Sequence, residues 1–213
     1  MDSIMKVEMF ELGPVMTNAY LVYDLHTKKG IVFDPGMNPD RLLQRIEELQ
    51  LKIEAILLTH AHFDHMGGVE EVRTHTGAPV YIHQEEEDWL GDPMKNGSGR
   101  WPMMPKLTAR PAEHILVGGE TLQLAGFQFD VLYTPGHSPG SISFFDGVHV
   151  FSGDALFRDS IGRTDLYGGS HRTLMDSIKK KLMELPGNTV VYSGHGPKTT
   201  INRERKSNPF IME

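Results

Sequence analysis

Short apolar segments alternate along this chain with longer segments whose apolar residues recur at helical spacing. The short segments are bounded by Gly, Pro, Asp or Asn, as strands commonly are. They predict strands at Val7–Leu12, Ala19–Leu25, Gly30–Phe33, Ala55–Leu58, Val80–Ile82, Phe127–Tyr133, Ser141–Phe145, Val148–Phe151 and Thr189–Tyr192. The longer segments predict helices at Pro39–Leu49, Met66–Thr76, Gln84–Leu90 and His171–Leu185. This alternation predicts an α/β fold in which helices cover the faces of sheets.

The segment 91–112 follows neither pattern, because Gly and Pro interrupt it repeatedly. Trp101, Met103 and Met104 nevertheless give it apolar surface. A loop of this length in a compact domain is usually functional or disordered. We expect it to be ordered and to form one wall of a substrate pocket, with Trp101 as a substrate-binding residue. It could equally cover an edge of the core or mediate contact between subunits.

Composition narrows the possible functions. With 213 residues, of which 39% are hydrophobic, the chain can bury one sizeable core, so we expect a single domain over residues 1–213. No stretch approaches the ~18 apolar residues of a membrane span and none resembles a signal peptide, so we expect a cytoplasmic protein without membrane contact. A net charge of -7 argues against nucleic acid as a partner. The sequence leaves the oligomeric state open.

The absence of cysteine restricts metal binding to imidazole and carboxylate, which favours Zn, Fe or Mn. Such residues follow apolar strands in the segments GIVFDPG, AILLTHAHFDH, VLYTPGHSPG, VFSGDALF and VVYSGHG. In layered α/β folds the loops after the strands converge on one edge. The candidate ligands are His60, His62, Asp64, His65, His137, Asp154 and His195. So many ligands indicate two ions side by side, although the last three would singly be ordinary loop residues.

The motifs HAHFDH, Gly-His, Ser-Gly-Asp and Ser-Gly-His-Gly, in this order, resemble the metallo-β-lactamase superfamily over most of the chain. Within it, GDALFRDSIGRTDLYGG and GHGPKTT are similar to the glyoxalase II branch, especially its bacterial single-domain members. The resemblance implies a four-layer αββα sandwich. It also implies that one ion is bound by His60, His62 and His137, that the second is bound by Asp64, His65 and His195, and that Asp154 bridges them.

The resemblance further implies a metal-dependent hydrolase. Two ions roughly 3.5 to 4 Å apart can share a hydroxide that forms near neutral pH and attacks a carbonyl. We expect Asp64 and Asp154 to serve this chemistry, Asp64 by orienting the nucleophile or collecting its proton. The ions, these carboxylates and the hydroxide leave a site charge of about +1, which favours anionic substrates. We therefore expect hydrolysis of small anionic thioesters such as S-acyl glutathione.

Two further residues have open assignments. Arg163, in Gly162-Arg163-Thr164-Asp165, matches a basic residue that contacts substrate in glyoxalase II-like enzymes, and we expect it to bind a substrate carboxylate. It could instead pair with Asp159 or Asp165 and hold the loop's shape. Asp34 is either a turn residue or a carboxylate that orients a metal-binding histidine.

Other members of the fold supply the alternatives. Two-domain glyoxalase II enzymes have a further helical domain with basic glutathione contacts, and we expect no such domain here. An antibiotic substrate is not expected, because true β-lactamases of this fold usually lack an aspartate where Asp154 stands. Persulfide dioxygenases, which use one iron and consume oxygen, also resemble Gly162-Arg163-Thr164-Asp165 and are the main alternative. A metal-binding module without catalysis is the third, although no ligand is missing here.

Overall fold

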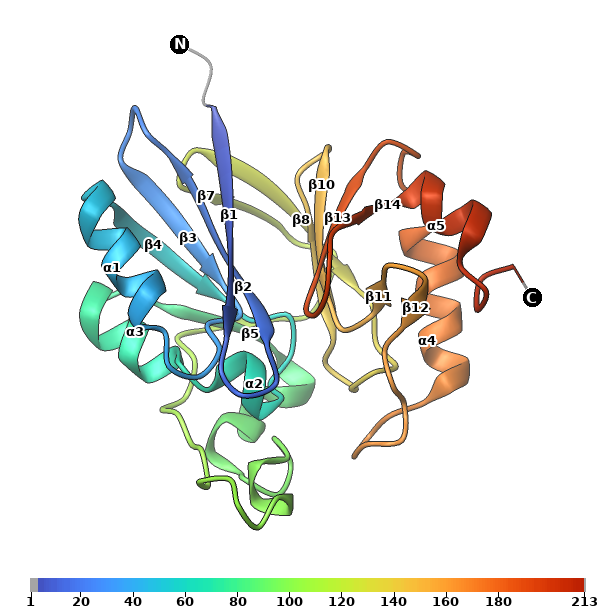
Figure 1. Ribbon diagram of the computed structural model, residues 1–213, viewed down its shortest axis with the longest axis horizontal. Coiled ribbons are helices and arrows are strands. Elements are labelled where there is room, and N and C mark those ends of the chain that lie inside the picture. The colour runs from blue at the N-terminus through green and yellow to red at the C-terminus, as the bar shows by residue number, and fades with distance from the viewer. Residues whose placement is uncertain (1–3, 213) are drawn as a thin grey trace.

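Two six-stranded sheets lie face to face in the computed structural model, which describes residues 4–212 (Figure 1). The first sheet contains, in spatial order, β1 (Met5–Leu12), β2 (Thr17–Asp24), β3 (Lys29–Phe33), β4 (Lys52–Leu57), β5 (Val80–His83) and β6 (His114–Leu116). Strands β1 to β3 are antiparallel, and β3 to β6 are parallel.

The second sheet repeats this plan in part. Its spatial order is β14 (Thr199–Thr200), β13 (Val190–Ser193), β10 (His149–Gly153), β9 (Ile142–Phe145), β8 (Phe127–Tyr133) and β7 (Thr121–Leu124). Strands β7 to β10 are antiparallel, β13 pairs parallel with β10, and β14 closes the edge antiparallel to β13. A separate hairpin joins β11 (Leu156–Phe157) to β12 (Ser160–Ile161).

Helices cover the outer face of each sheet. They are α1 (Asp40–Leu49), α2 (Phe63–Met66) and α3 (Val69–Thr76) beside the first sheet, and α4 (His171–Ser177) and α5 (Ile201–Ser207) beside the second (Figure 1). Two 3-10 helices, Gln84–Gly91 and Ser98–Arg100, precede β6, and a π-helical turn, Ile178–Leu182, continues α4. No helix in the described range is long and apolar enough to cross a membrane.

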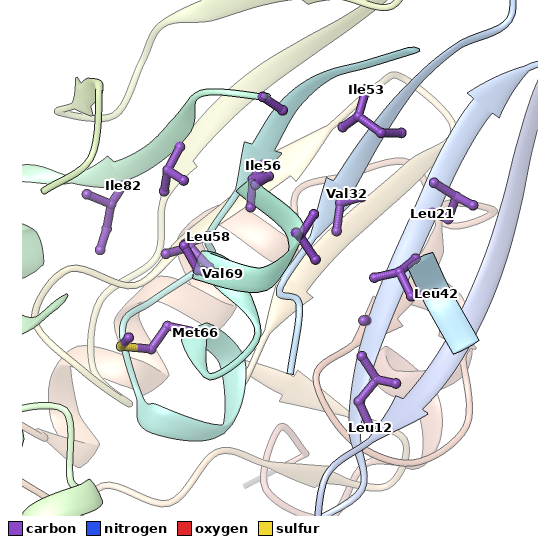
Figure 2. Packing of buried hydrophobic residues seen from close by; sticks show 14 of the residues in the cluster. Leu12, Leu21, Val32, Leu42, Ile53, Ile56, Leu58, Met66, Val69 and Ile82 are labelled. Atoms are coloured by element: carbon purple, nitrogen blue, oxygen red, sulfur yellow. The ribbon is translucent and has the colours of Figure 1, made fainter. Parts of the chain in front are cut away.

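Three buried clusters fill the spaces between these layers. The outer cluster of the first sheet packs Leu42 of α1 and Val69 of α3 against Val32 and Ile56 (Figure 2). The central cluster lies between the sheets and is aromatic. In it the rings of Phe33 and Phe151 stack with centroids 4.2 Å apart. These rings belong to GIVFDPG and VFSGDALF, two of the segments in which an apolar strand runs into a turn with an acidic residue.

The third cluster packs α4 and α5 on the outer face of the second sheet, through residues such as Leu174, Ile201 and Val191. The layers therefore run helix, sheet, sheet, helix, and the predicted αββα sandwich is confirmed. Strands β2 and β3 are buried on both faces, which fits their apolar runs at residues 19–23 and 30–33.

Several predicted boundaries were wrong. The helix expected at Met66–Thr76 is in fact two helices, because the chain turns at Gly67 and Gly68. A Cβ at residue 68 would lie 2.3 Å from the carbonyl oxygen of Gly36, so two loops approach closely where only glycine fits. The helix expected at Gln84–Leu90 is a 3-10 helix. Strands β6, β7, β11, β12 and β14, and helix α5, were not predicted.

Candidate metal centre

The seven candidate ligands follow the ends of four strands from both sheets. His60 comes after β4, the next three lie in or beside α2, and the remaining three follow β8, β10 and β13. Their ligand atoms form three groups, in each of which all atoms lie within 4.8 Å of one another. The groups are His60, His62 and His137; His60, His65 and Asp154; and Asp64, His65 and His195. Shared members join the groups into one cluster.

The first group consists of imidazoles whose ring nitrogens converge. Nδ1 of His62 and Nε2 of His137 are 2.9 Å apart. The other nitrogen of His137, Nδ1, donates to the backbone oxygen of Arg163 at 2.8 Å, which leaves the Nε2 lone pair free. Burial lowers the pKa of His60 well below its usual range and that of His62 to about 3. Both rings are therefore neutral, which is the form that binds cations.

The second group contains a carboxylate between two imidazoles. Oδ2 of Asp64 lies 3.2 Å from Nε2 of His195 and 3.4 Å from Nε2 of His65, and it accepts a hydrogen bond from the Thr17 hydroxyl at 2.7 Å. Burial acts to raise the pKa of Asp64, but these neighbours outweigh it and lower the pKa. Burial also acts to lower the pKa of His65, but the carboxylates of Asp154 and Asp64 raise it well above its usual range. The group thus attracts positive charge.

Asp154 lies between the two groups. Its Oδ1 is 3.3 Å from Nε2 of His65, whereas its Oδ2 is 3.5 Å from Nε2 of His137 and 3.6 Å from Nε2 of His195. Oδ2 therefore lies near one imidazole of each group, and Oδ1 lies near the second group, so this carboxylate can reach both. A Cβ at residue 194 would lie 2.1 Å from Oδ1 of Asp154, so Gly194 leaves the room that this carboxylate occupies.

Buried polar atoms without hydrogen-bond partners show whether the cluster suits bound cations. Nε2 of His60, Nε2 of His65 and Oδ1 of Asp154 are buried, and no described residue hydrogen-bonds to any of them. Buried polar atoms without partners are rare and costly unless an ion or water satisfies them. Divalent cations at the two groups would satisfy all three atoms, and a set of imidazoles and carboxylates suits Zn, Fe or Mn.

Asp34 fixes the orientation of the His65 ring. Its Oδ2 accepts from Nδ1–H of His65 at 3.1 Å, so that Nε2 of His65 turns toward the centre. Its other contacts are to Thr59, whose backbone N–H and hydroxyl donate at 2.8 and 2.7 Å. Asp34 has a positive φ of 46°, which is unusual outside glycine and fits a constrained functional turn. Asp34 is therefore placed to orient the imidazole of His65.

Glu86, in the 3-10 helix Gln84–Gly91, holds two of the loops that carry candidate ligands. It was not identified from the sequence. It is fully buried, and its two carboxylate oxygens accept from the backbone N–H groups of Ala61 at 2.5 Å and Gly140 at 2.8 Å. Ala61 separates two candidate ligands, and Gly140 ends the turn after His137. Glu86 therefore ties a loop of the first sheet to a loop of the second.

The loop of His195 is held from the opposite end of the chain. The backbone N–H of Asn18 donates to the oxygen of Gly194 at 2.7 Å. Its side-chain amide donates to the oxygens of Ser193 at 3.0 Å and Gly196 at 2.8 Å. Strand β2 thus positions the last candidate ligand.

Comparison with known proteins places this geometry in a family. Residues 12–195 match the family described as the metallo-beta-lactamase superfamily. The chain belongs to this superfamily. It is 46% identical over 209 residues to "Probable metallo-hydrolase YqgX" of Bacillus subtilis, a match that covers 97% of this chain and 98% of the relative. It is 37% identical over 210 residues to "Hydroxyacylglutathione hydrolase GloC" of Haemophilus influenzae, with the same coverage of 97% and 98%.

Solved structures of the superfamily share the whole architecture. One, described as BLEG-1 B3 metallo-beta-lactamase, is 48% identical with a TM-score of 0.94 and covers 98% of this chain and 100% of its own. Another, TTHA1623 in a di-iron-bound form, is 40% identical with a TM-score of 0.83 and covers 96% and 100%. The resemblance to glyoxalase II-like members is confirmed, and the superfamily and the histidine and aspartate cluster together indicate a metal-dependent hydrolase.

A cavity of about 180 Å³ opens onto the candidate metal ligands, and its lining includes His62, Asp64, His137, Asp154 and His195. Its apolar lining comprises Val15, Phe63, Trp101, Leu166 and Tyr167, and its basic lining comprises Lys95, Arg100 and Arg163. Trp101 therefore lines this cavity, whereas Met103 points to solvent and is 98% exposed. Neither Tyr167 nor Arg100 was singled out from the sequence: Arg100 belongs to no quoted motif, and Tyr167 lies in GDALFRDSIGRTDLYGG without a role of its own.

Arg163, which lines the cavity, makes two kinds of contact with its neighbours. Its backbone oxygen holds His137, as described above. Its guanidinium pairs with Asp165, with Nε to Oδ1 and Nη2 to Oδ2 both at 2.7 Å. The loop-shaping pair considered from the sequence is thus present, and Nη1 is the guanidinium nitrogen without a partner among the described residues.

Proposed function

We propose that this protein hydrolyses small anionic thioesters, such as S-acyl glutathione, with two divalent ions, most simply zinc, or else iron or manganese. The observation that carries the proposal is the position of Asp154, whose carboxylate lies within 3.6 Å of imidazoles from both groups of ligands. The relative named hydroxyacylglutathione hydrolase GloC supports a thioester as the substrate. The related di-iron structure supports two ions and keeps iron among the candidates.

When bound, the two ions would polarise the thioester carbonyl and make hydroxide available near neutral pH. The residues of the chain supply the rest. Asp64, fixed by the Thr17 hydroxyl, is our candidate for orienting the nucleophile and accepting its proton. Asp154 would hold the two halves of the site at a fixed separation. No serine or cysteine nucleophile is required.

The cavity fits a substrate with an apolar part and an anionic part. The Trp101 side of the cavity offers apolar surface to an acyl chain. Arg163 is our candidate for a contact to a substrate carboxylate through Nη1, while Asp165 holds the rest of its guanidinium. Neither nucleic acid nor a membrane is needed in this proposal.

Metal analysis combined with two activity assays tests the proposal. Protein loaded with Zn or Fe should hold two ions per chain and hydrolyse a panel of acyl thioesters. An oxygen electrode with glutathione persulfide tests the alternative, a dioxygenase with one iron. One iron with oxygen uptake and no thioester turnover would replace the proposal by that alternative.

A second candidate function is hydrolysis of β-lactams, which is favoured by the 48% identical structure described as a B3 metallo-beta-lactamase. A chromogenic cephalosporin in the same metal-loaded protein tests it. Turnover of the cephalosporin at a higher kcat/KM than every thioester would make this the principal activity.

A further inference from the structure

The basic residues around the cavity differ in how they are neutralised. Lys95 pairs with Asp88, and Arg163 pairs with Asp165. Arg100, by contrast, has no carboxylate partner within residues 4–212. Its Nε donates to the backbone oxygen of Met94 at 2.9 Å, and neither of its Nη nitrogens donates to a described residue. Arg100 therefore brings to the cavity an uncompensated positive charge and two Nη nitrogens whose N–H groups have no partner among the described residues.

The guanidinium of Arg100 is held in place by aromatic contacts that lead to the metal centre. It lies over the ring of Tyr167, 5.6 Å from the centroid. Tyr167 packs on the buried Trp89 at 5.5 Å, and Trp89 packs on the ring of His62 at 5.8 Å. The position of Arg100 is thus linked to a candidate ligand through two rings.

The backbone around Arg100 is fixed to the same region. Its N–H donates to the oxygen of Gly97 at 3.1 Å. The oxygen of the buried Asn96 accepts from the N–H of Phe63, the first residue of α2, at 2.9 Å. The side chain of Asn96 donates to the oxygens of Trp89 and Leu107, which fastens both ends of this loop. The charge of Arg100 therefore belongs to an ordered wall of the cavity.

We propose that Arg100 binds a carboxylate of the thiol portion of the substrate and so selects acidic thiols, such as glutathione, over uncharged thiols. A planar guanidinium held at Nε and supported on a ring presents its remaining donors to a carboxylate at little entropic cost. This inference rests on the proposed thioester hydrolysis and names the substrate class of that site. It makes Arg100 a specificity-determining residue, outside the metal ligands.

Binding of a ligand that cannot be hydrolysed separates this inference from the activity itself. S-hexylglutathione and its diester, in which both carboxylates are blocked, are titrated calorimetrically into the metal-loaded protein. Arg100→Ala should weaken binding of S-hexylglutathione by roughly ten- to a hundredfold, the effect of a charged hydrogen bond. Binding of the diester should change less than about twofold, and Arg100→Lys should fall between the wild type and Arg100→Ala.

Lys106→Ala is the matched control, because Lys106 is an exposed cation of the same loop that does not line the cavity. It should leave both affinities unchanged. Equal losses for the acid and the diester in Arg100→Ala, or equal losses in Arg100→Ala and Lys106→Ala, would overturn the inference.

Hydrolysis assays then compare glutathione, N-acetylcysteamine and coenzyme A thioesters of one acyl group. Arg100→Ala should lower kcat/KM for the glutathione thioester alone. A loss confined to the coenzyme A thioester would overturn the carboxylate in favour of phosphate. If the wild type hydrolyses no thioester but binds S-hexylglutathione in an Arg100-dependent way, the proposed function fails and the role of Arg100 stands.

Discussion

At three candidate ligands, a neighbour occupies the ring nitrogen that faces away from the centre. Nδ1 of His65 meets Asp34, Nδ1 of His137 meets the Arg163 backbone, and Nδ1 of His60 lies 3.0 Å from the Thr59 hydroxyl. Each contact fixes the direction of the ring and directs Nε2 toward the centre of the cluster. The residues behind the ligands should therefore matter for affinity almost as much as the ligands.

Asp34→Ala tests this at one residue. Without its acceptor, the His65 ring loses its fixed orientation, and we expect metal affinity to fall by about 10- to 100-fold. Competition with a chromogenic chelator measures the change. Asp146→Ala is the control, because Asp146 also accepts backbone N–H groups and an imidazole N–H, from His149 at 2.9 Å, but lies in the turn between β9 and β10. Equal affinities in the two variants would contradict the role of Asp34.

The seven side chains named from the sequence lie together because each follows an apolar strand or the turn after it, and that pattern is visible without a structure. Glu86 could not be recognised, since it stands in the acidic run Gln-Glu-Glu-Glu-Asp, where an exposed helix face is the ordinary interpretation. Arg100 carries no motif, and its free charge is defined only by what surrounds it. The roles of such residues depend on contacts between segments that are far apart in the sequence, so a local sequence pattern does not reveal them.

Among the elements, the long segment 91–112 shows which secondary structure can be predicted from sequence patterns and which cannot. Its Gly and Pro content correctly excluded a long helix or strand, but the short 3-10 helix Ser98–Arg100 was not predicted. The missed strands have two to four residues, too few for an alternating pattern, and exist because a neighbour supplies hydrogen bonds. Helix and strand cores were predictable where apolar periodicity was long, as in α1 and β8.

Trp101→Ala tests the role of this loop. Trp101 is 56% exposed and lines the cavity, so its removal should cost roughly 1 kcal/mol of apolar contact and raise KM for bulky acyl groups about fivefold. Metal content should stay the same. Met103→Ala is the control from the same loop, and it should leave KM unchanged. An unchanged KM in Trp101→Ala, with a changed elution volume on a sizing column, would favour a subunit contact instead.

For the whole molecule, the cluster joins two halves that also meet through the aromatic core and through the hydrogen bonds of Glu86 and Asn18. His60, His62, Asp64 and His65 come from the first half, and the other three ligands come from the second. Ions bound between them would stabilise the packing of one sheet on the other. Metal should therefore contribute to folding stability as well as to catalysis.

Thermal unfolding with and without metal measures this contribution. At a free metal concentration 100 times Kd, each site should add about 2.7 kcal/mol, which for a chain of this size is a rise in Tm of roughly 5 to 10 °C. Asp154→Ala should abolish the rise and lose both ions, because each ion loses a ligand. Asp176→Ala, at an exposed carboxylate of α4, should keep both. Two tightly held ions in Asp154→Ala would rule out the bridge.

The hydrogen bonds between Asn18 and the turn around His195 also determine an order of events during translation. Asn18 and Gly196 are separated by 178 positions, so their contacts form only after Gly196 has left the ribosome. At ~5 to 20 residues per second, His195 is synthesised roughly 7 to 26 seconds after His65. During that interval the nascent chain presents the histidines of the first half without Asp154 or His195. The complete set of candidate ligands therefore comes together only after His195 has left the ribosome.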